Sequence, residues 1–409
     1  MNSQPIIVQK YGGSSVADAE RIRNVARRIA RRRADGTRVV VVVSAMGDTT
    51  DDLIALAQQV SSTRPAREMD ALLSAGEIIA SALLAMALQD IGVDAISLTG
   101  LQAGIRTDRV HSKARILNIE PRRIVDELDR GRTVIIAGFQ GVTSELDVTT
   151  LGRGGSDTSA VALAIALHAA ACERFTDVEG VFTTDPRIEP RARKLRDIGY
   201  EEMLELASAG SKILHPRAVE LAWLYNLPVL VASSFTDAPG TLIHGGPSME
   251  PANKARGIAH DYDVAKITIR GVPDRPGIAA ALFGPLADAA ISVDTIVQNA
   301  SLDNLTDLTF TVAKNDLQRS LEIVRPIASD IGARDIAADT NLGKVSLVGT
   351  GMQNTPGYAA RMFRTLADQG INIDLITTSE IRITVIIKES EVEKAVRALH
   401  AAFELDRED

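Results

Sequence analysis

The last third of the chain repeats itself, and this repeat constrains the fold more than any other feature. Each copy has the pattern of a strand, a loop with Pro-Gly, a helix, two further strands and a final helix. The matched segments begin at Lys266 and Lys344, at Pro276 and Pro356, at Leu286 and Leu366, and at Ile291 and Ile371. Because these matches keep their order and spacing, they predict two tandem βαββαβ units.

The preceding part alternates short β-branched runs with longer amphipathic or Ala-rich stretches. Val39–Val43 is five valines in a row, and a run that is apolar on both faces suits a central strand covered by helices on both sides. This alternation predicts an α/β domain with a mainly parallel sheet. Strands are predicted over 6–8, 39–43, 95–98, 134–137 and 229–232, and helices over 18–33, 157–171, 200–208 and 216–225.

A change of composition near residue 236 predicts the domain boundaries. Thr236–Gly240 and Gly245–Pro251 are rich in proline and glycine, which is typical of a linker. We therefore expect a first domain over 1–235, a linker over 236–262, and the two repeat domains over 263–340 and 341–409.

Charge and composition exclude some classes of protein. The formal net charge of −8 argues against a protein that mainly binds nucleic acid. Cys172 is the only cysteine, so neither an internal disulfide nor a cysteine-based zinc site is possible. The N-terminus lacks a leader pattern, and no purely apolar run approaches the roughly 20 residues of a membrane span. The sequence predicts a soluble, cytoplasmic protein without a membrane partner.

The first polar motif lies between the strand at 6–8 and the helix at 18–33. Lys10-Tyr11-Gly12-Gly13-Ser14-Ser15 places glycines at a strand-to-helix turn, where backbone N–H groups can approach a phosphate. Because the lysine precedes the glycines, this is not a Walker A loop. A tight turn with a surface lysine is the alternative, and the motif alone does not decide between them.

A second motif, Thr149–Thr158, opens the Ala-rich helix. It combines glycines and hydroxyls with Arg153 and Asp157. Arg153 can bind a carboxylate through two parallel hydrogen bonds. Asp157 either caps the helix or orients a cation or reacting group, and the density of special residues favours the functional interpretation.

Four further motifs place polar residues at turns: Ser44–Thr50, Ser74–Glu77, Thr176–Arg187 and Ser211–Pro216. Ligands of open α/β sheets bind at the carboxyl ends of strands, as Ser44–Thr50 would allow. Asp185-Pro186 is also an ordinary turn signal, and His215 before Pro216 can simply start a helix. Phosphate-binding glycines, two lysines, an arginine and an aspartate, without a His/Cys nucleophile set, favour phosphoryl transfer.

In combination, Lys10–Ser15, Thr150–Asp157, Thr176–Arg187 and the C-terminal repeat make the chain resemble the aspartate kinase (aspartokinase) family over nearly its whole length. The resemblance implies a three-layer, carbamate-kinase-like amino-acid-kinase domain followed by two ferredoxin-like ACT domains. It also implies phosphorylation of L-aspartate by ATP to 4-phospho-L-aspartate, the first step toward lysine, threonine and methionine. Mg²⁺ would arrive with ATP, held by phosphate oxygens and water, so no dedicated metal ligand is expected.

The same resemblance implies roles for single residues. Lys10 would neutralise the transferring phosphoryl group, with Asp157 beside it as the catalytic carboxylate. Arg153 would bind the α-carboxylate of aspartate, and Glu77 would receive the α-ammonium group or order the site. Further substrate contacts would be Ser44, Thr50, Gly155 and Ser156. The nucleotide contacts would be Lys10, Gly12, Gly13, Ser14, Thr176, Asp177, Phe182, Asp185, Arg187 and Lys212.

The two repeats resemble amino-acid sensors that pair side by side, which implies a homo-oligomer regulated by lysine, threonine or both. A Pro-Gly loop before a helix exposes N–H groups to a ligand carboxylate. Asp294 and Asp374 are interpreted as residues that merely end strands. The expected effector contacts are Asp274, Gly277, Ile278, Ala279, Gln298 and Asn299 in the first copy, and Asn354, Thr355, Gly357, Asn372, Ile373, Ser379 and Glu380 in the second.

Alternatives stay open at this point. A sister kinase would act on glutamate or acetylglutamate, and a catalytically dead sensor is disfavoured because Lys10 and Asp157 are both present. The arginine run of 27–33 could bind nucleic acid, although a solvated helix face is favoured. Met249 is a candidate internal start for a separate regulatory subunit, although an ordinary linker methionine is favoured.

Overall fold

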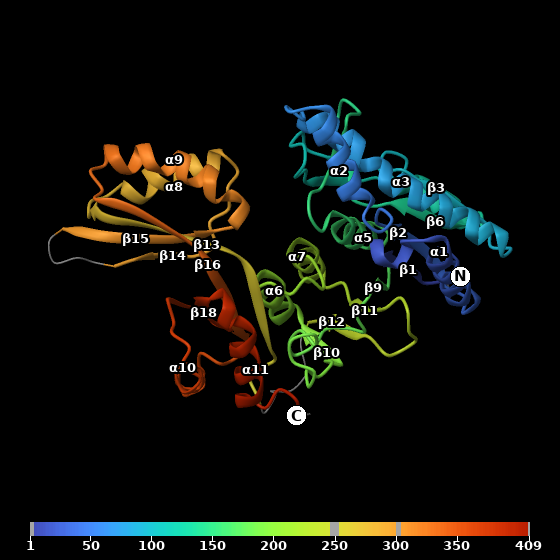
Figure 1. Ribbon diagram of the computed structural model, residues 1–409. Helices are drawn as coiled ribbons and strands as arrows, with labels where there is room; N and C mark the ends of the chain where they lie inside the picture. Colours follow the sequence, from blue (N-terminus) through green and yellow to red (C-terminus); the bar gives the residue numbers. More distant parts are fainter. Residues whose placement is uncertain (1–3, 246–252, 300–303, 408–409) are drawn as a thin grey trace. The chain divides into compact units, whose positions relative to one another are not determined.

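The computed structural model describes residues 4–245, 253–299 and 304–407 (Figure 1). Its contacts divide the chain into two compact units. Met249 lies outside the described residues. Unit 1 comprises Met1–Phe182, Lys194–Ala207 and Lys212–Pro251, and unit 2 comprises Thr183–Arg193, Ser208–Ser211 and Ala252–Asp409.

Unit 1 is built on an eight-stranded sheet with the order β10-β12-β11-β9-β1-β2-β6-β3. Most neighbouring strands run parallel, while β12 is antiparallel to β11. This confirms the predicted α/β class. The strands are β1 (Ile6–Tyr11), β2 (Arg38–Val43), β3 (Ala95–Leu98), β6 (Thr133–Ala137), β9 (Ala171–Thr176), β10 (Asp197–Gly199), β11 (Val229–Ser233) and β12 (Thr241–His244).

Helices cover both faces of this sheet, as the five valines require. Val39, Val41 and Val43 share one buried core with α1 (Ala19–Ala34) and α3 (Ala66–Asp90). Side chains alternate along a strand, so Val40 and Val42 face the other way. There α5 (Gly155–Ala166) contacts β1, β2 and β9. The three-layer prediction is confirmed.

A small sheet that the sequence did not predict lies beside this core, in the order β5-β4-β7-β8. Its strands of three or four residues are too short to show a periodic pattern. They are β4 (Ile105–Thr107), β5 (Ile116–Ile119), β7 (Gln140–Val142) and β8 (Val148–Thr150). The remaining helices of unit 1 are η1 (Gly13–Val16), α2 (Thr49–Val60), α4 (Arg122–Asp129), α6 (Tyr200–Ser208) and α7 (Pro216–Leu224).

One predicted helix is too long. The helix predicted over 157–171 ends at Ala166, and Ala171 already begins β9. A run of alanines favours a helix by intrinsic propensity. Here the Ala170 N–H donates to the Ile6 carbonyl at 2.8 Å, and β9 pairs with β1 and β11. Sheet pairing therefore overrides propensity at this point.

One described helix, α3, is long and apolar enough to cross a membrane, judged by length and composition alone. Charged residues interrupt this helix, so it contains no purely apolar run of that length. In the structure Leu84 and Leu88 of α3 are fully buried in the core of unit 1. Asp70 and Glu77 on the same helix are buried as well. One side of α3 therefore belongs to the core of unit 1.

Unit 2 contains one antiparallel six-stranded sheet, in the order β14-β15-β13-β16-β18-β17. Figure 1 shows α8 and α9 side by side on one of its faces. The tandem βαββαβ prediction is confirmed. The strands are β13 (Gly257–Pro273), β14 (Ile296–Gln298), β15 (Leu305–Val312), β16 (Asp335–Val348), β17 (Leu375–Thr378) and β18 (Arg382–Lys388). The helices are α8 (Ile278–Asp288), η2 (Lys314–Asp316), α9 (Leu317–Asp330), α10 (Tyr358–Asp368), η3 (Glu389–Glu391) and α11 (Val392–Ala402).

The strands β13 and β16 each serve both repeats. Residues 265–273 of β13 pair with β15, whereas 257–261 pair with the half of β16 that also pairs with β18. The predicted linker over 236–262 therefore differs from the structure at both ends. Residues 241–244 form β12, and 257–261 join the sheet of the second repeat. Proline and glycine mark turns, but they do not show where the next strand begins to pair.

Residues 183–193 also depart from the predicted division, since they pack in unit 2. The Thr183 hydroxyl and His400 Nε2 are 2.9 Å apart, and Arg397 Nε donates to the Ile188 carbonyl at 2.9 Å. These contacts join sequence-distant positions, so the sequence pattern could not indicate them.

Two ion pairs cross between the repeats. Lys344 Nζ lies 2.9 Å from Asp294 Oδ2, and Lys266 Nζ pairs with Asp374 Oδ2. Lys266 matches Lys344 and Asp294 matches Asp374 in the repeat, so each lysine binds the aspartate of the other copy. The interpretation that the two aspartates merely end strands is wrong, because β13 and β16 are neighbours in one sheet.

We expect Asp294→Ala to destabilise unit 2. It leaves the Lys344 side chain, only 6% exposed, without its counter-charge, which should lower the free energy of unfolding by about 1–2 kcal/mol. Urea unfolding and hydrogen exchange along β16 would measure this. The matched control is Glu393→Ala, which breaks an exposed pair with Arg397 and should cost less than about 0.5 kcal/mol. Equal losses in the two variants would contradict the prediction.

Candidate active site

Lys10, Asp157 and Arg174 form a buried charged triad. Lys10 lies near the carboxyl end of β1, and Asp157 lies in the first turn of α5. Lys10 Nζ is 2.8 Å from Asp157 Oδ1, and the side chains are 7% and 6% exposed. Arg174, which pairs with Lys10 across β1 and β9, donates from Nε to the same Oδ1 at 3.1 Å. Two cations thus share one carboxylate.

Opposing effects set the protonation of this triad. Burial alone would raise the pKa of Asp157, but the charges of Arg174 and Lys10 lower it to about 2. The carboxylate is therefore ionised at neutral pH. Burial lowers the pKa of Lys10, Arg174 lowers it further, and Asp157 opposes both.

The triad carries a net charge of +1 with both cations protonated. Arg174 Nη1 is buried and lacks a hydrogen-bond partner among the described residues. A buried positive charge with an unused donor is suited to an anion that brings its own acceptor oxygens.

The glycine turn follows directly after Lys10. The Gly12 N–H donates to the Phe175 carbonyl at 3.3 Å, and η1 begins at Gly13. A Cβ at Gly13 would lie 2.8 Å from the Ala45 carbonyl oxygen, so a side chain does not fit there. Ser14 is half-buried, and its carbonyl accepts a hydrogen bond from Arg21.

The predicted substrate residues other than Glu77 lie in three segments of unit 1. Ser44 follows β2 and donates its N–H to the Tyr11 carbonyl at 3.1 Å, while Thr50 lies in the first turn of α2. Arg153 is exposed on the turn before α5 and has no side-chain partner among the described residues. Gly155 and Ser156 are buried in the first turn of α5.

His215 supports this turn. It caps α7, where Pro216 starts the helix as the sequence predicted, and its ring lies against Gly154. A Cβ at Gly154 would be 2.2 Å from the ring, and the residue has φ +67°. Only glycine satisfies both conditions.

Glu77 lies on α3 and interacts with Lys10 and with the backbone of Ala45. Its side chain is 4% exposed, and Oε2 has no hydrogen-bond partner among the described residues. Burial raises its pKa to about 7, opposed by a backbone hydrogen bond from Ala45 and by the charge of Lys10. A buried carboxylate with a free oxygen can receive an ammonium group.

The structure divides the predicted nucleotide residues between the units. Thr176 ends β9 and donates its hydroxyl to Asp177 at 2.9 Å. Phe182 and the exposed Lys212 also belong to unit 1. Asp185 and Arg187 pair with each other at 2.7 Å and belong to unit 2.

Most predicted effector residues are at least partly exposed, and two of them directly precede equivalent helices. Gly277 and Gly357 precede α8 and α10 with φ +94° and +111°, a conformation that favours glycine. Ile278 is instead buried in the first repeat's core, and Ile373 packs against the core of the second. Thr355 donates its hydroxyl to the Gly351 carbonyl. The exposed members are Asp274, Ala279, Gln298, Asn299, Asn354, Asn372, Ser379 and Glu380.

Arg174 is absent from the predicted site. A signal existed, because Glu173 and Arg174 are charged residues between the buried Cys172 and Phe175. A short strand was expected directly before Thr176, but the helix predicted over 157–171 covered the start of β9, and Arg174 was not recognised as a site residue.

The arginine run of α1 binds other parts of unit 1. Arg28 and Arg31 pair with Asp237, and Arg32 pairs with Glu173. Arg33 donates to the Gly131 carbonyl at 2.7 Å. These contacts favour the structural interpretation of the run over nucleic-acid binding.

The fold and the site define a class. Unit 1 is a three-layer α/β unit with a charged triad beside a glycine turn, and unit 2 consists of two βαββαβ repeats. This combination is typical of an amino-acid kinase joined to ACT domains. The amino acid kinase family matches residues 5–233, and the ACT domain matches 267–328 and 345–403.

Individual relatives narrow the class. The aspartokinase of Mycolicibacterium smegmatis is 53% identical over 409 residues, 99% of this chain and 97% of that protein. The aspartokinase of Pseudomonas aeruginosa is 53% identical over 403 residues, 98% of each. The crystal structure of E. coli aspartokinase III with aspartate and ADP is similar with a TM-score of 0.85 at 26% identity, covering 97% of this chain and 99% of that one.

The chain belongs to the aspartokinase family. It is an ATP-dependent phosphotransferase whose acceptor is the β-carboxylate of L-aspartate. This decides against a glutamate kinase and against a dead sensor.

We expect Arg174→Met to lower kcat by at least about tenfold, because it removes one of the two basic side chains that would stabilise a transferring phosphoryl group at this site. Arg174→Lys should recover part of the loss. Steady-state kinetics at saturating ATP and aspartate would measure both. Arg32→Met is the control, since Arg32 binds Glu173 on the same strand but not Asp157. An unchanged kcat in Arg174→Met would show that catalysis does not require Arg174.

Proposed function

We propose that this chain phosphorylates aspartate with Lys10 and Arg174 as the groups that neutralise the transferring phosphoryl oxygens. The observation that carries this proposal is that two basic side chains, Lys10 and Arg174, share one buried carboxylate. The β-carboxylate of aspartate is already ionised at neutral pH, so the reaction needs no general base. Asp157 therefore holds Lys10 in place rather than removing a proton, and catalysis consists of positioning and charge neutralisation.

Aspartate would be held by its two α-substituents. Arg153 has a free guanidinium fork for the α-carboxylate, and Glu77 has a free oxygen for the α-ammonium. Opposite charges at the two positions select an amino acid over a simple dicarboxylate. Ser44, Thr50, Gly155 and Ser156 would complete the pocket. The E. coli enzyme crystallised with aspartate and ADP supports this substrate pair.

ATP would lie along the glycine turn. Gly12, Gly13 and Ser14 present backbone groups after Lys10, where phosphates can bind. Mg²⁺ would be held by phosphate oxygens and water, because the Asp157 carboxylate is already engaged by Lys10 and Arg174. The other proposed nucleotide contacts in unit 1 are Thr176, Asp177, Phe182 and Lys212, whereas Asp185 and Arg187 belong to unit 2.

Unit 2 would sense lysine, threonine or both. The structure of E. coli aspartokinase III with lysine and aspartate, at a TM-score of 0.74 and 26% identity, supports an amino-acid effector. The positive-φ glycines 277 and 357 begin α8 and α10, where N–H groups can bind a carboxylate.

A homo-oligomer would form through the edges of the six-stranded sheet. The edge strands β14 and β17 expose Ile296 and Ile376, which are 53% and 46% exposed and occupy matching positions of the repeat. Such edges are suited to pairing with a second copy. We propose that the enzyme acts in the cytoplasm. A separate regulatory subunit starting at Met249 stays a prediction outside the described residues.

The expected activity is ADP release that requires ATP, Mg²⁺ and L-aspartate, with the acyl phosphate trapped by hydroxylamine. Asp157→Ala should abolish it, because Lys10 then loses the carboxylate that positions it. Lysine, threonine or both together should suppress turnover in the same assay. Turnover with L-glutamate but not L-aspartate would overturn the proposal, and turnover that ignores both effectors would overturn its regulatory part.

Glu77 should give the enzyme a pH dependence. Because its pKa is about 7, the carboxyl is protonated at lower pH and cannot pair with an ammonium group. We expect kcat/KM for aspartate to fall as the pH drops through about 7, and Glu77→Gln to be weak at every pH without this step. A step that persists in Glu77→Gln would assign it to another group.

The same pKa has a stability consequence of opposite sign. A folded-state pKa above the unfolded value of about 4.3 means that ionised Glu77 destabilises the fold as the pH rises from about 4 to 7. Glu77→Gln should therefore be more stable than the wild type at pH 8, by up to about 3 kcal/mol, and the two should converge near pH 4. Thermal unfolding across this range measures the difference.

A further inference from the structure

The first half of α3 buries polar side chains, although the helix lies in the core. Asp70, Ser74, Glu77 and Ser81 recur at intervals of three or four residues, so they share one face, and all four are buried. Glu77 is already assigned to the substrate. Asp70, two turns before it, takes no part in the mechanism above.

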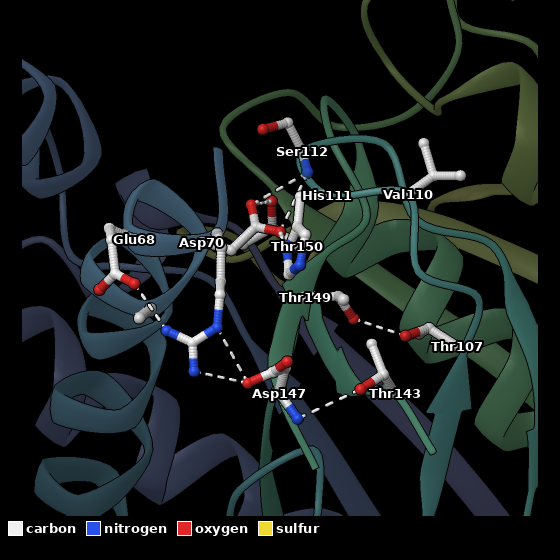
Figure 2. A network of polar contacts seen from close by, with 12 residues as sticks. Glu68, Asp70, Thr107, Val110, His111, Ser112, Thr143, Asp147, Thr149 and Thr150 are labelled. Atoms are coloured by element: carbon white, nitrogen blue, oxygen red, sulfur yellow. Dashed lines mark hydrogen bonds and ion pairs between the residues drawn. The ribbon is translucent and has the colours of Figure 1, made fainter. Parts of the chain in front are cut away.

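Asp70 is fully buried and fully satisfied (Figure 2). The hydroxyl of Thr150 donates to Oδ1 at 2.6 Å, and His111 Nδ1 lies 2.8 Å from Oδ2. The Ser112 N–H is 3.1 Å from Oδ1 and 3.0 Å from Oδ2. No lysine or arginine pairs with Asp70 in the described part of the chain. Directional hydrogen bonds, rather than a salt bridge to a lysine or arginine, thus hold this buried carboxylate.

These bonds join two loops to one helix. Thr150 is the last residue of β8, and the turn that carries Arg153 follows it directly. Ser112 belongs to the loop that packs on this turn, because a Cβ at Gly152 would lie 2.9 Å from the Ser112 carbonyl oxygen. The Ala114 N–H also donates to the Thr150 carbonyl at 3.0 Å. Asp70 therefore fixes the base of the Arg153 turn from both sides.

Ser112 shows that this arrangement is imposed. Its φ is +68°, a left-handed conformation that a serine rarely adopts. Both carboxylate oxygens of Asp70 accept the Ser112 N–H and hold the backbone in this conformation. The carboxylate of Asp70 is therefore coupled directly to the backbone of the loop that packs on the Arg153 turn.

We propose that Asp70 is a positioning residue for aspartate, acting through Thr150 on the turn that presents Arg153. The proposal rests on the role of Arg153 given above. One helix would then position both α-substituents of aspartate. Glu77 would contact the α-ammonium directly, and Asp70 would position Arg153, which binds the α-carboxylate. A rigid helix keeps these two positions at a fixed separation.

The test is to remove the hydroxyl of Thr150 in the full-length enzyme. Thr150→Val keeps the shape but removes the bond to Asp70, and we expect the KM for aspartate to rise about tenfold while the KM for ATP stays within about twofold. Thr150→Ser keeps the hydroxyl and should restore the KM for aspartate. Asp70→Ala should give the same shift, and adding Thr150→Val to it should change little more, because both act through one bond. If Asp70→Ala does not fold, the Val and Ser pair still decides.

Arg67→Gln is the matched control. Arg67 lies one turn before Asp70 on α3 and binds Asp147 at 2.6 Å, at the other end of β8 and in a more exposed position. It should leave the KM for aspartate unchanged. A Thr150→Val enzyme that melts earlier but keeps its KM for aspartate would overturn the proposal, since the network would then be structural only.

Arg153→Ala separates this proposal from the one on which it rests. If it leaves the KM for aspartate unchanged, the assigned role of Arg153 is wrong, and the positioning role of Asp70 falls with it. If it raises that KM while Thr150→Val does not, only the positioning role is wrong. If both raise it and Thr150→Ser restores it, both roles stand.

Discussion

The sharing of one buried carboxylate by two cations is the interaction on which the active site depends. Asp157 can stay ionised in the core only because Lys10 and Arg174 lie within about 3 Å of it. The two cations in turn need β1 and β9 to be parallel neighbours in register. The sheet therefore does more than provide a scaffold, since its pairing creates the positive charge that the reaction requires.

A second constraint comes from α3, which combines an apolar and a polar buried face. Leu84 and Leu88 anchor it in the core, while Asp70 and Glu77 supply polar atoms toward the turns that surround the site. Burying carboxylates costs free energy, and the structure offsets this cost differently at the two positions. Asp70 has three hydrogen-bonding partners, whereas Glu77 has an oxygen without a partner among the described residues and a raised pKa. The unsatisfied group is the one suited to a ligand.

The sequence predicted the layers and most of the site because these follow from local patterns. Five consecutive valines indicated a strand buried on both faces, and the matched repeats indicated two βαββαβ units. Arg174 was missed because the helix predicted from an alanine run extended over the start of β9. The Asp70 network was missed because its members are about 40 and 80 positions apart and no periodicity links them. The pairing of β13 with strands of both repeats was missed for the same reason, because tertiary packing decides which strands pair.

The strands β13 and β16 each belong to both repeats of unit 2 and join the repeats into one sheet. Each half of β13 pairs with a different half of β16, and Lys266 and Lys344 each bind the aspartate of the opposite repeat. The helices α8 and α10 therefore connect strands of one continuous sheet. If each helix start binds an effector, as we propose, both effectors act on the same backbone pairing. This pairing then provides a direct physical connection between the two proposed sites within unit 2.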